Sequence, residues 1–187
     1  MANGILGVSQ LEMLSQSGTG IITVIPPATN TNRTLTLPDE TGTIALAQSL
    51  SYVRLNTANG YGSTNTKIRR FTNVLENQGV DITYADSATL GGSFTINTNG
   101  VYSIHFAEAP NAAGDFGVSL NSTQLTTSIY SITLADKIAA ATSAVNGYLT
   151  VCSVTVYIAA TGVVRAHTDG GAATGGRASL FTIARVA

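Results

Sequence analysis

Hydrophobic and polar residues alternate along most of the chain after residue 51, which is the pattern of half-buried β-strands. The clearest stretch is FTINTNGVYSIHFAE, residues 94–108, where two alternating runs flank an Asn-Gly turn. Many short strands between Gly- and Asn-rich turns are typical of an all-β sandwich or barrel. The pattern predicts strands, in chain order, over residues 52–57, 67–72, 80–84, 93–96, 101–106, 116–120, 124–130, 147–158, 163–167 and 179–186.

One segment competes with an all-β fold. Residues 134–144, LADKIAAATSA, are rich in alanine, which favours a helix. The same residues equally suit an extended crossover between sheets, and we interpret them as a loop or an edge strand.

The first 50 residues follow a different pattern. Leu11 and Leu14 lie three apart, which predicts a short helix over residues 9–14, and proline or turn residues bound three short strands at 21–25, 33–37 and 43–46. Strands this short and few bury too little to be stable alone. We therefore expect residues 1–50 to form an attachment arm whose strands pair with copies of themselves, ahead of a knob at 51–187. The apolar positions expected to carry these contacts are Ile21, Ile22, Val24, Ile25, Leu35, Leu37, Ile44 and Leu46.

Composition explains how such a chain covers its surface. Only 10% of residues are charged, against about a quarter in a typical domain, so Thr, Ser, Asn and Gly must supply the polar surface. This is common in β-proteins with neutral polar faces and in chains that bury surface against their own copies. The net charge of -1 gives no basic field for nucleic acid. The N-terminus lacks a charged leader and a long apolar run, so we expect neither a signal peptide nor a membrane span.

The residues that could carry chemistry are few. Cys152 shares a strand face with Val154 and Val156, so we interpret it as a buried hydrophobe without a neighbouring base. His105 alternates out of phase with the aromatic residues around it, so it should face solvent or a neighbouring subunit. Two histidines, His105 and His167, without a metal-binding spacing give no zinc signature.

The acidic residues give no stronger case for an enzyme. Asp81, Asp86 and Asn77 could approach a calcium ion, but no Asp-x-Asp-x-Asp-Gly loop is present, and we interpret the two aspartates as a solvated loop pair. No nucleophile elbow or phosphate loop occurs. We therefore predict a protein that is not an enzyme and has no cofactor and no metal. Sequence does not place together the carboxylates a glycosidase would need, Glu76, Asp86, Glu108 and Asp115.

The run from Ile68 to Glu108 resembles the globular head of complement and its tumour-necrosis-factor-like relatives. The resemblance rests on the VLxNQG-like stretch at 74–79, on Phe94, and on the Gly-Val-Tyr strand that begins at Gly100, with ASLFTIARVA at 178–187 similar to the closing strand. It covers most of residues 52–187. It implies an all-β, ten-strand jelly-roll sandwich that assembles as a homotrimer.

A second resemblance concerns TNRTLTLPDETGTIA at 31–45, which is similar to a segment found in bacteriophage fibre and virion-surface proteins. Such segments commonly precede a distal domain and intertwine around a threefold axis. Together the two resemblances imply a structural protein of the virion surface, made in the host cytoplasm, whose partner is the major capsid protein or a tail protein. Two virion functions stay open: a capsid decoration (cement or head-fibre) protein, or a short tail fibre whose knob binds a host-cell receptor. A third alternative is a trimeric binding module that is not from a phage, such as a bacterial surface or secreted lectin-like head. In the second case the expected loop contacts are Tyr61, Asn65, Asp169 and Arg177.

Overall fold

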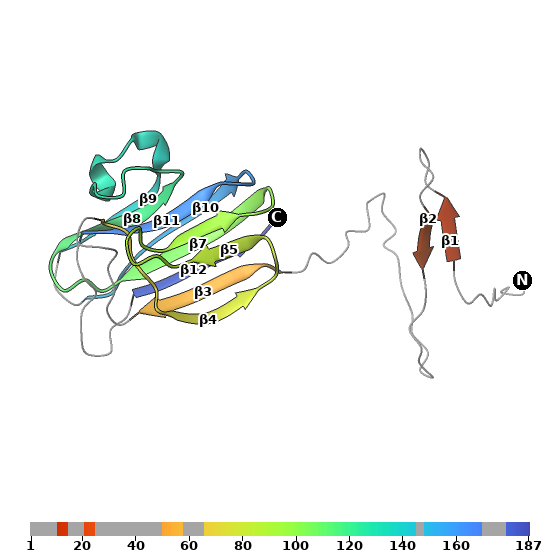
Figure 1. The fold of residues 1–187 in the computed structure, drawn as a ribbon, viewed down its shortest axis with the longest axis horizontal. Coiled ribbons are helices and arrows are strands. Elements are labelled where there is room, and N and C mark those ends of the chain that lie inside the picture. Colours follow the sequence, from red (N-terminus) through yellow and green to blue (C-terminus); the bar gives the residue numbers. More distant parts are fainter. Residues whose placement is uncertain (1–10, 15–20, 25–49, 58–65, 145–147, 170–178) are drawn as a thin grey trace, which may run out of the picture. The chain divides into compact units, whose positions relative to one another are not determined.

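The computed structural model describes residues 11–14, 21–24, 50–57, 66–144, 148–169 and 179–187. The chain divides into two units, Met1–Ile44 and Ala45–Ala187. In the first, β1 (Leu11–Leu14) and β2 (Ile21–Val24) form an antiparallel pair (Figure 1). The helix expected over residues 9–14 is therefore wrong, because Leu11–Leu14 is extended. Pairing with β2 satisfies backbone groups that one isolated helical turn would leave open.

The second unit, the knob, contains two five-stranded antiparallel sheets (Figure 1). From β6 onward the chain crosses between the sheets at every step except β8 to β9, so strands that are neighbours in a sheet are often distant in sequence. This order is that of a jelly roll, and the predicted fold class is confirmed. The first sheet runs β10 (Thr150–Ile158), β7 (Gly100–Glu108), β12 (Ser179–Arg185), β3 (Tyr52–Thr57) and β4 (Asn73–Gln78). The second runs β5 (Ile82–Ala85), β6 (Ser93–Ile96), β11 (Val163–Thr168), β8 (Gly114–Leu120) and β9 (Lys137–Ser143).

Aromatic side chains fill the space between the sheets. Phe94 and Phe181 stack with ring centroids 4.3 Å apart, and Phe106 meets Phe116 edge to face at 5.4 Å. Burying each of these side chains is worth about 1.5–3 kcal/mol. The alternation in β7 places Phe106 inside, as the sequence pattern predicts.

Two predicted strands are wrong. Residues 67–72 make only an isolated bridge, between Ile68 and His167, because the chain there turns the Arg69 side chain inward to Glu108. Residues 124–130 do not pair in a sheet. Local hydrogen bonds form instead, since Gln124 N donates to Ser122 Oγ and Thr127 N donates to the Gln124 carbonyl, and such local bonds compete with strand pairing.

The segment from 122 to 136 contains two short 3-10 helices, η1 (Ile129–Ser131) and η2 (Leu134–Asp136). The edge strand β9 follows directly, so the extended interpretation of residues 134–144 is confirmed and the helical one is confined to η2. Strand β4, which the alternation did not single out, lies at the opposite edge of the first sheet.

Candidate oligomerisation surface

Strands β9 and β10 end their two sheets on the same side of the sandwich and contact each other there; together they are called the β9–β10 edge below. An edge strand presents unpaired backbone N–H and C=O groups, which proteins usually protect with charged residues, proline or a covering segment. From Ile138 to Val164 the chain contains no Asp, Glu, Lys, Arg or Pro. After Lys137, therefore, the β9–β10 edge has none of these protecting residues.

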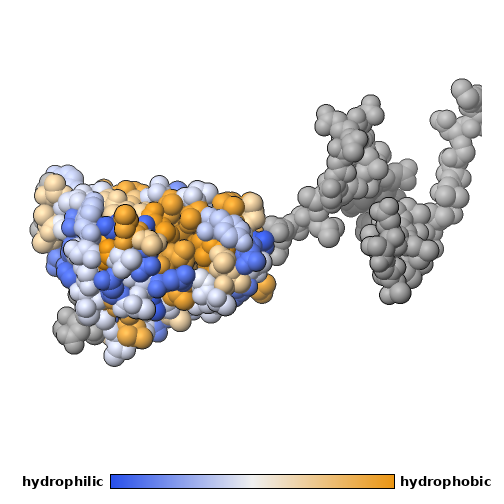
Figure 2. Space-filling view, turned by 90° about the horizontal axis from the view of Figure 1, so that it is seen from above, coloured by the Kyte–Doolittle hydropathy of each residue, from blue (hydrophilic) through white to orange (hydrophobic). Residues whose placement is uncertain are grey.

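Apolar side chains continue from this edge onto the outer face of the first sheet. Val151 and Tyr157 of β10 are 55% and 62% exposed. On the neighbouring strand β7 their register partners are Ala107 and Val101, and Ala107 in turn pairs with Leu180 of β12. Figure 2 views the knob from the edge where β9 and β10 lie in Figure 1, and it shows a hydrophobic area in the middle of that edge. The edge and the adjoining sheet face thus form one apolar surface.

Between these apolar rows lie small, uncharged polar side chains. Ser153 of β10 pairs with His105 of β7, and His105 pairs with Thr182 of β12. His105 is exposed, as predicted, and its Nε2 lies 3.2 Å from Ser103 Oγ. The first formally charged side chain along this row is Arg54 on β3. A partner packing on β10, β7 and β12 would therefore bury no fixed charge.

The opposite side of the sandwich, where β4 and β5 are the edge strands, is charged; it is called the β4–β5 edge below. Glu76 of β4 lies 3.7 Å from Arg54, and Asp86, just after β5, makes a 2.6 Å ion pair with Arg70. The pairing of β3 with β4 also shifts register between Arg54 and Leu55, which distorts that edge. Charge and irregular register are two of the ordinary protections of an exposed edge.

Asp81, between β4 and β5, is not the solvated loop residue that we expected. It is 8% exposed and lies 3.4 Å from Arg185. A hydrogen bond from Thr98, helped by Ser51 and by Arg185, lowers the pKa of the Asp81 carboxyl below its ordinary value despite burial. The carboxylate therefore helps to hold the closing strand through Arg185.

The carboxylates that a glycosidase would need lie apart. Glu76 and Asp86 have the arginine partners just described, and Asp115 accepts a 2.8 Å hydrogen bond from Thr142. Glu108 is fully buried beside Arg69, and the four carboxylates have no partner in common. Within the described residues no three His, Cys, Asp or Glu side chains gather as a metal site would require.

The Arg69–Glu108 ion pair joins the C-terminal end of β7 to the segment before β4. Arg69 Nε donates to Glu108 Oε2 at 3.2 Å, and Ser179 Oγ donates to the same oxygen at 2.7 Å. Burial raises the pKa of Glu108, and the Arg69 charge acts in the opposite direction. Sequence reasoning missed this pair because its members lie 39 positions apart and neither position is apolar.

Cys152 and the histidines occupy separate places. Cys152 faces the core of the sandwich at 6% exposure, as predicted, and burial raises the pKa of its thiol to about 12. His105 lies on the outer face of the first sheet, whereas His167 lies on β11 of the second sheet. They share no site.

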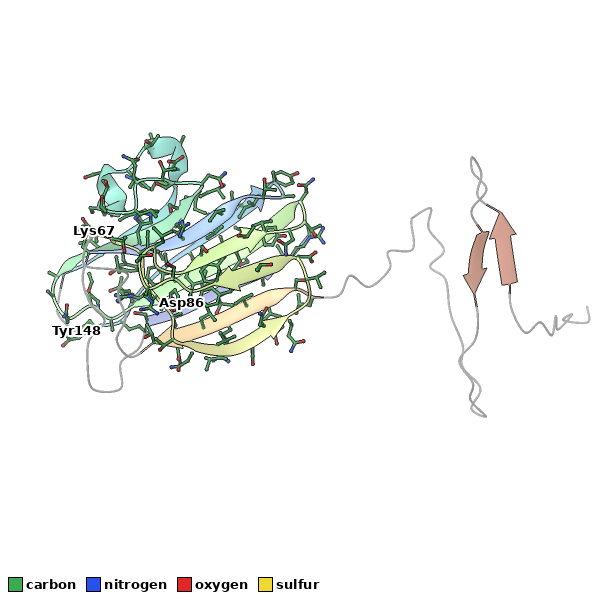
Figure 3. The ribbon with its side chains drawn as sticks, in the orientation of Figure 1. Lys67, Asp86 and Tyr148 are labelled. Atoms are coloured by element: carbon green, nitrogen blue, oxygen red, sulfur yellow. The ribbon has the colours of Figure 1, made fainter. Side chains whose placement is uncertain are left out.

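The predicted loop contacts are only partly within the described residues. Asp169 is half-buried; its carboxylate accepts a 2.9 Å hydrogen bond from Lys67 Nζ and a 3.0 Å bond from Ser128 Oγ. Lys67 and the exposed Tyr148 lie toward the end of the knob away from the C-terminal residue (Figures 1 and 3). Tyr61, Asn65 and Arg177 lie outside the described residues.

The predicted attachment residues are divided in the same way. Ile21, Ile22 and Val24 belong to β2, which pairs with β1 of the same chain. The others, Ile25, Leu35, Leu37, Ile44 and Leu46, lie outside the described residues. Across the described part of the chain, no helix is long and apolar enough to span a bilayer.

No protein-family model matches the chain, and no curated protein matches it. Solved structures match in fold. Pika GITRL is 11% identical over 75% of this chain and 98% of its own, with a TM-score of 0.42. Murine APRIL at pH 5.0 is 7% identical over 73% of this chain and 99% of its own, with a TM-score of 0.46. Both are jelly-roll proteins of the tumour-necrosis-factor family. Likenesses of this size concern the fold alone, and the strand order of the knob carries the jelly-roll assignment by itself.

Proposed function

We propose that this chain is a non-enzymatic structural protein of a bacteriophage virion, a homotrimer in which the jelly-roll knob follows an N-terminal attachment arm. The observation that carries the oligomer is the uncharged β9–β10 edge, which continues into the apolar outer face of β10, β7 and β12. A long edge without charge or proline invites pairing with any other chain. Covering it with a second copy of the same chain removes that liability and buries apolar surface at about 25 cal/mol per Å².

A closed ring is the arrangement that suits this surface. In our proposal the β9–β10 edge of one protomer packs on the outer face of β7 and β12 of the next. Such a contact joins two different patches, so it must either close into a ring or continue as a filament. The trimer implied by the resemblance of residues 68–108 closes it with three identical contacts. The charged β4–β5 edge then stays on the periphery in water.

The virion assignment rests on the resemblance of TNRTLTLPDETGTIA, at 31–45, to segments of phage surface proteins. We favour a capsid decoration protein whose residues 1–50 form the arm that grips the capsid. Three arms on a threefold site would grip the capsid by avidity, without chemistry. The LPDETGT motif at 37–43 favours the alternative, a short tail fibre with an adhesive knob.

The trimer is tested by sedimentation equilibrium of the full chain across a range of concentrations. We expect a single species of three times the 19.2 kDa chain mass. A monomer at every concentration, or a continuous series of larger species, would contradict the closed ring.

The placement is tested by electron microscopy of whole particles labelled with antibody against residues 51–187. Label distributed over the head is the expected result for a decoration protein. Label confined to the tail tip would replace it with the tail-fibre function, and in that case purified trimer should compete with phage for adsorption to host cells. Unlabelled particles would exclude both.

A further inference from the structure

Residues 122–136, called the strap here, lie across the outer face of the second sheet. Ile129 of η1 is fully buried, although it is not part of the core between the sheets. A Cβ atom added to Gly117 of β8 would lie 2.7 Å from Ile129 Cγ1, so the strap packs directly on the strand backbone there. Further contacts are the Ser128–Asp169 hydrogen bond and a 2.9 Å bond from Lys137 Nζ to the Tyr130 carbonyl.

His167 lies beneath this strap. It is the register partner of Gly117, and Val164 and Ala166 on the same strand face the core, so His167 points outward to the side that the strap covers. Its exposed fraction is 0%. The backbone of Thr127, in the strap, is near enough to the ring to favour its charged form. Yet within the described residues neither ring nitrogen has a hydrogen bond of normal geometry.

Two further buried polar groups on this face also lack hydrogen-bond partners within the described residues. Arg165, two residues before His167, pairs in register with Ser119 of β8. Arg165 Nη1 and Ser119 Oγ are buried and have no hydrogen-bond partner within the described part of the chain. Of the arginines described, Arg54, Arg69, Arg70 and Arg185 each have a carboxylate partner, and Arg165 has none. Buried polar groups without partners make a closed state costly, and opening would hydrate all three.

Little negative charge near His167 is left to neutralise a protonated imidazole beside the charged Arg165. Arg165 lies on the same strand and opposes protonation of the ring. Asp169 favours protonation, but its carboxylate already serves Lys67 Nζ and Ser128 Oγ. The other charged groups on the elements packed around this face are Asp136 of η2 in the strap, Asp115 of β8, which is bonded to Thr142, Lys137 of β9, and Arg69, which is paired with Glu108.

We propose that the strap is an acid-released cover: protonation of His167 drives residues 122–136 off β8 and β11 and exposes the apolar side chains of Ile129 and Ile132. Burial lowers the pKa of His167 from 6.5 to about 4. Because the pKa is lower when the strap is closed, the closed state is fully stable above about pH 6.5 and loses stability as the pH falls towards 4. The strap leads directly into β9, which belongs to the β9–β10 edge, so this cover lies next to the proposed trimer contact.

The test is hydrogen exchange of the full chain, followed by mass spectrometry and corrected for intrinsic exchange rates. Relative to pH 7.5, the protection of strap amides should fall about 4-fold at pH 6 and about 30-fold at pH 5. Peptides from β7 in the same sample serve as the internal reference. Unchanged strap protection at pH 5 in the unmodified protein would overturn the proposal, whatever the variants do.

Two histidine variants separate the strap from general acid effects, because the chain has only His105 and His167. His167→Gln should abolish the pH dependence of strap exchange, and His105→Gln, on the outer face of the other sheet, should preserve it. If His167→Gln does not fold, the imidazole titrations of the unmodified protein by NMR decide. A His167 pKa at or above 6 in the folded state would contradict the proposal, and one below 5 would support it.

Discussion

The two edges of the knob sandwich are built differently although they belong to the same two sheets. The β4–β5 edge carries Glu76 and Asp86, each with an arginine partner, and has an irregular register. The β9–β10 edge carries no charge after Lys137 and two of the most exposed apolar side chains of β10, Val151 and Tyr157. One edge is suited to water and the other to a protein surface.

The difference between the two edges shows that the few charged residues of this chain are unevenly distributed over the knob. A content of 10% charged residues could describe a sandwich that is neutral on all sides. Instead, the ion pairs of Glu76 and Asp86 lie at the β4–β5 edge, whereas the sequence from Ile138 to Val164 carries no charged residue. Four sets of substitutions test this comparison, from the largest expected effect to the smallest.

The largest effect should come from Glu108, whose buried carboxylate bonds Arg69, in the segment before β4, and Ser179 of β12. Glu108→Ala leaves the Arg69 guanidinium buried without its partner, which should cost about 3–5 kcal/mol of unfolding free energy. Urea unfolding measures it. The matched control, Glu76→Ala at the exposed β4–β5 edge, should cost no more than about 1 kcal/mol. Equal losses at the two positions would contradict the buried role of Glu108.

A charge placed in the uncharged edge should break the trimer without unfolding the knob. Thr155 is exposed on β10, and Gln78 is exposed on β4 in the same cross-strand row, linked through Ser103, Ala184 and Tyr52. Thr155→Lys should raise the trimer dissociation constant at least about 100-fold, because an unpaired ammonium is buried at the contact.

Gln78→Lys is the control for Thr155→Lys, and sedimentation equilibrium compares the two. It places the same charge on the same face at the other edge, so it should leave the trimer unchanged. If both variants dissociate, the contact spans the whole sheet; if neither does, the β9–β10 edge is not the interface.

Apolar truncations at the same edge should have an intermediate effect. Val151→Ala and Tyr157→Ala each remove apolar surface worth about 1.5–3 kcal/mol when buried, so each should weaken assembly about 10- to 100-fold. Val80, 77% exposed between β4 and β5, is the control, since Val80→Ala should not change assembly. Isothermal dilution calorimetry gives the dissociation constants. Equal weakening by Val80→Ala would remove the distinction between the edges.

The smallest effect should follow from the exposed ion pair of the β4–β5 edge. Arg54 and Glu76 side chains are 52% and 42% exposed and 3.7 Å apart. Arg54→Gln should change the unfolding free energy by no more than about 0.5 kcal/mol, and should leave assembly unchanged. A loss above about 2 kcal/mol in urea unfolding would mean that this edge is buried in the assembled protein.

Much of the fold follows from alternation alone, since β3 and β6 have the predicted bounds and β9 is an edge strand. The strands predicted at residues 67–72 and 124–130 do not form, because hydrogen bonds that alternation does not reveal decide the conformation of both segments. Both segments alternate like strands, but a long-range ion pair through Arg69 and local hydrogen bonds decide their conformation.

The candidate surface was less accessible to sequence reasoning. The uncharged run from Ile138 to Val164 is visible in the sequence. Its meaning depends on the sheet order, which places β9 and β10 at edges on the same side. His167 shows the same limit, because alternation places it outward and only the strap explains why it is buried.

The position of β12 has a consequence for how the knob is made. This closing strand lies in the middle of the first sheet, between β7 and β3, and pairs Ala184 with Tyr52 across the whole length of the knob. On the ribosome, β3 can pair with β4 early, but it must wait until residues 179–185 are synthesised before β12 arrives on its other side. Pairings of such sequence separation fold slowly, and the unpaired strands stay open to aggregation during that delay. Folding of the knob is thus expected to finish only after its synthesis is complete.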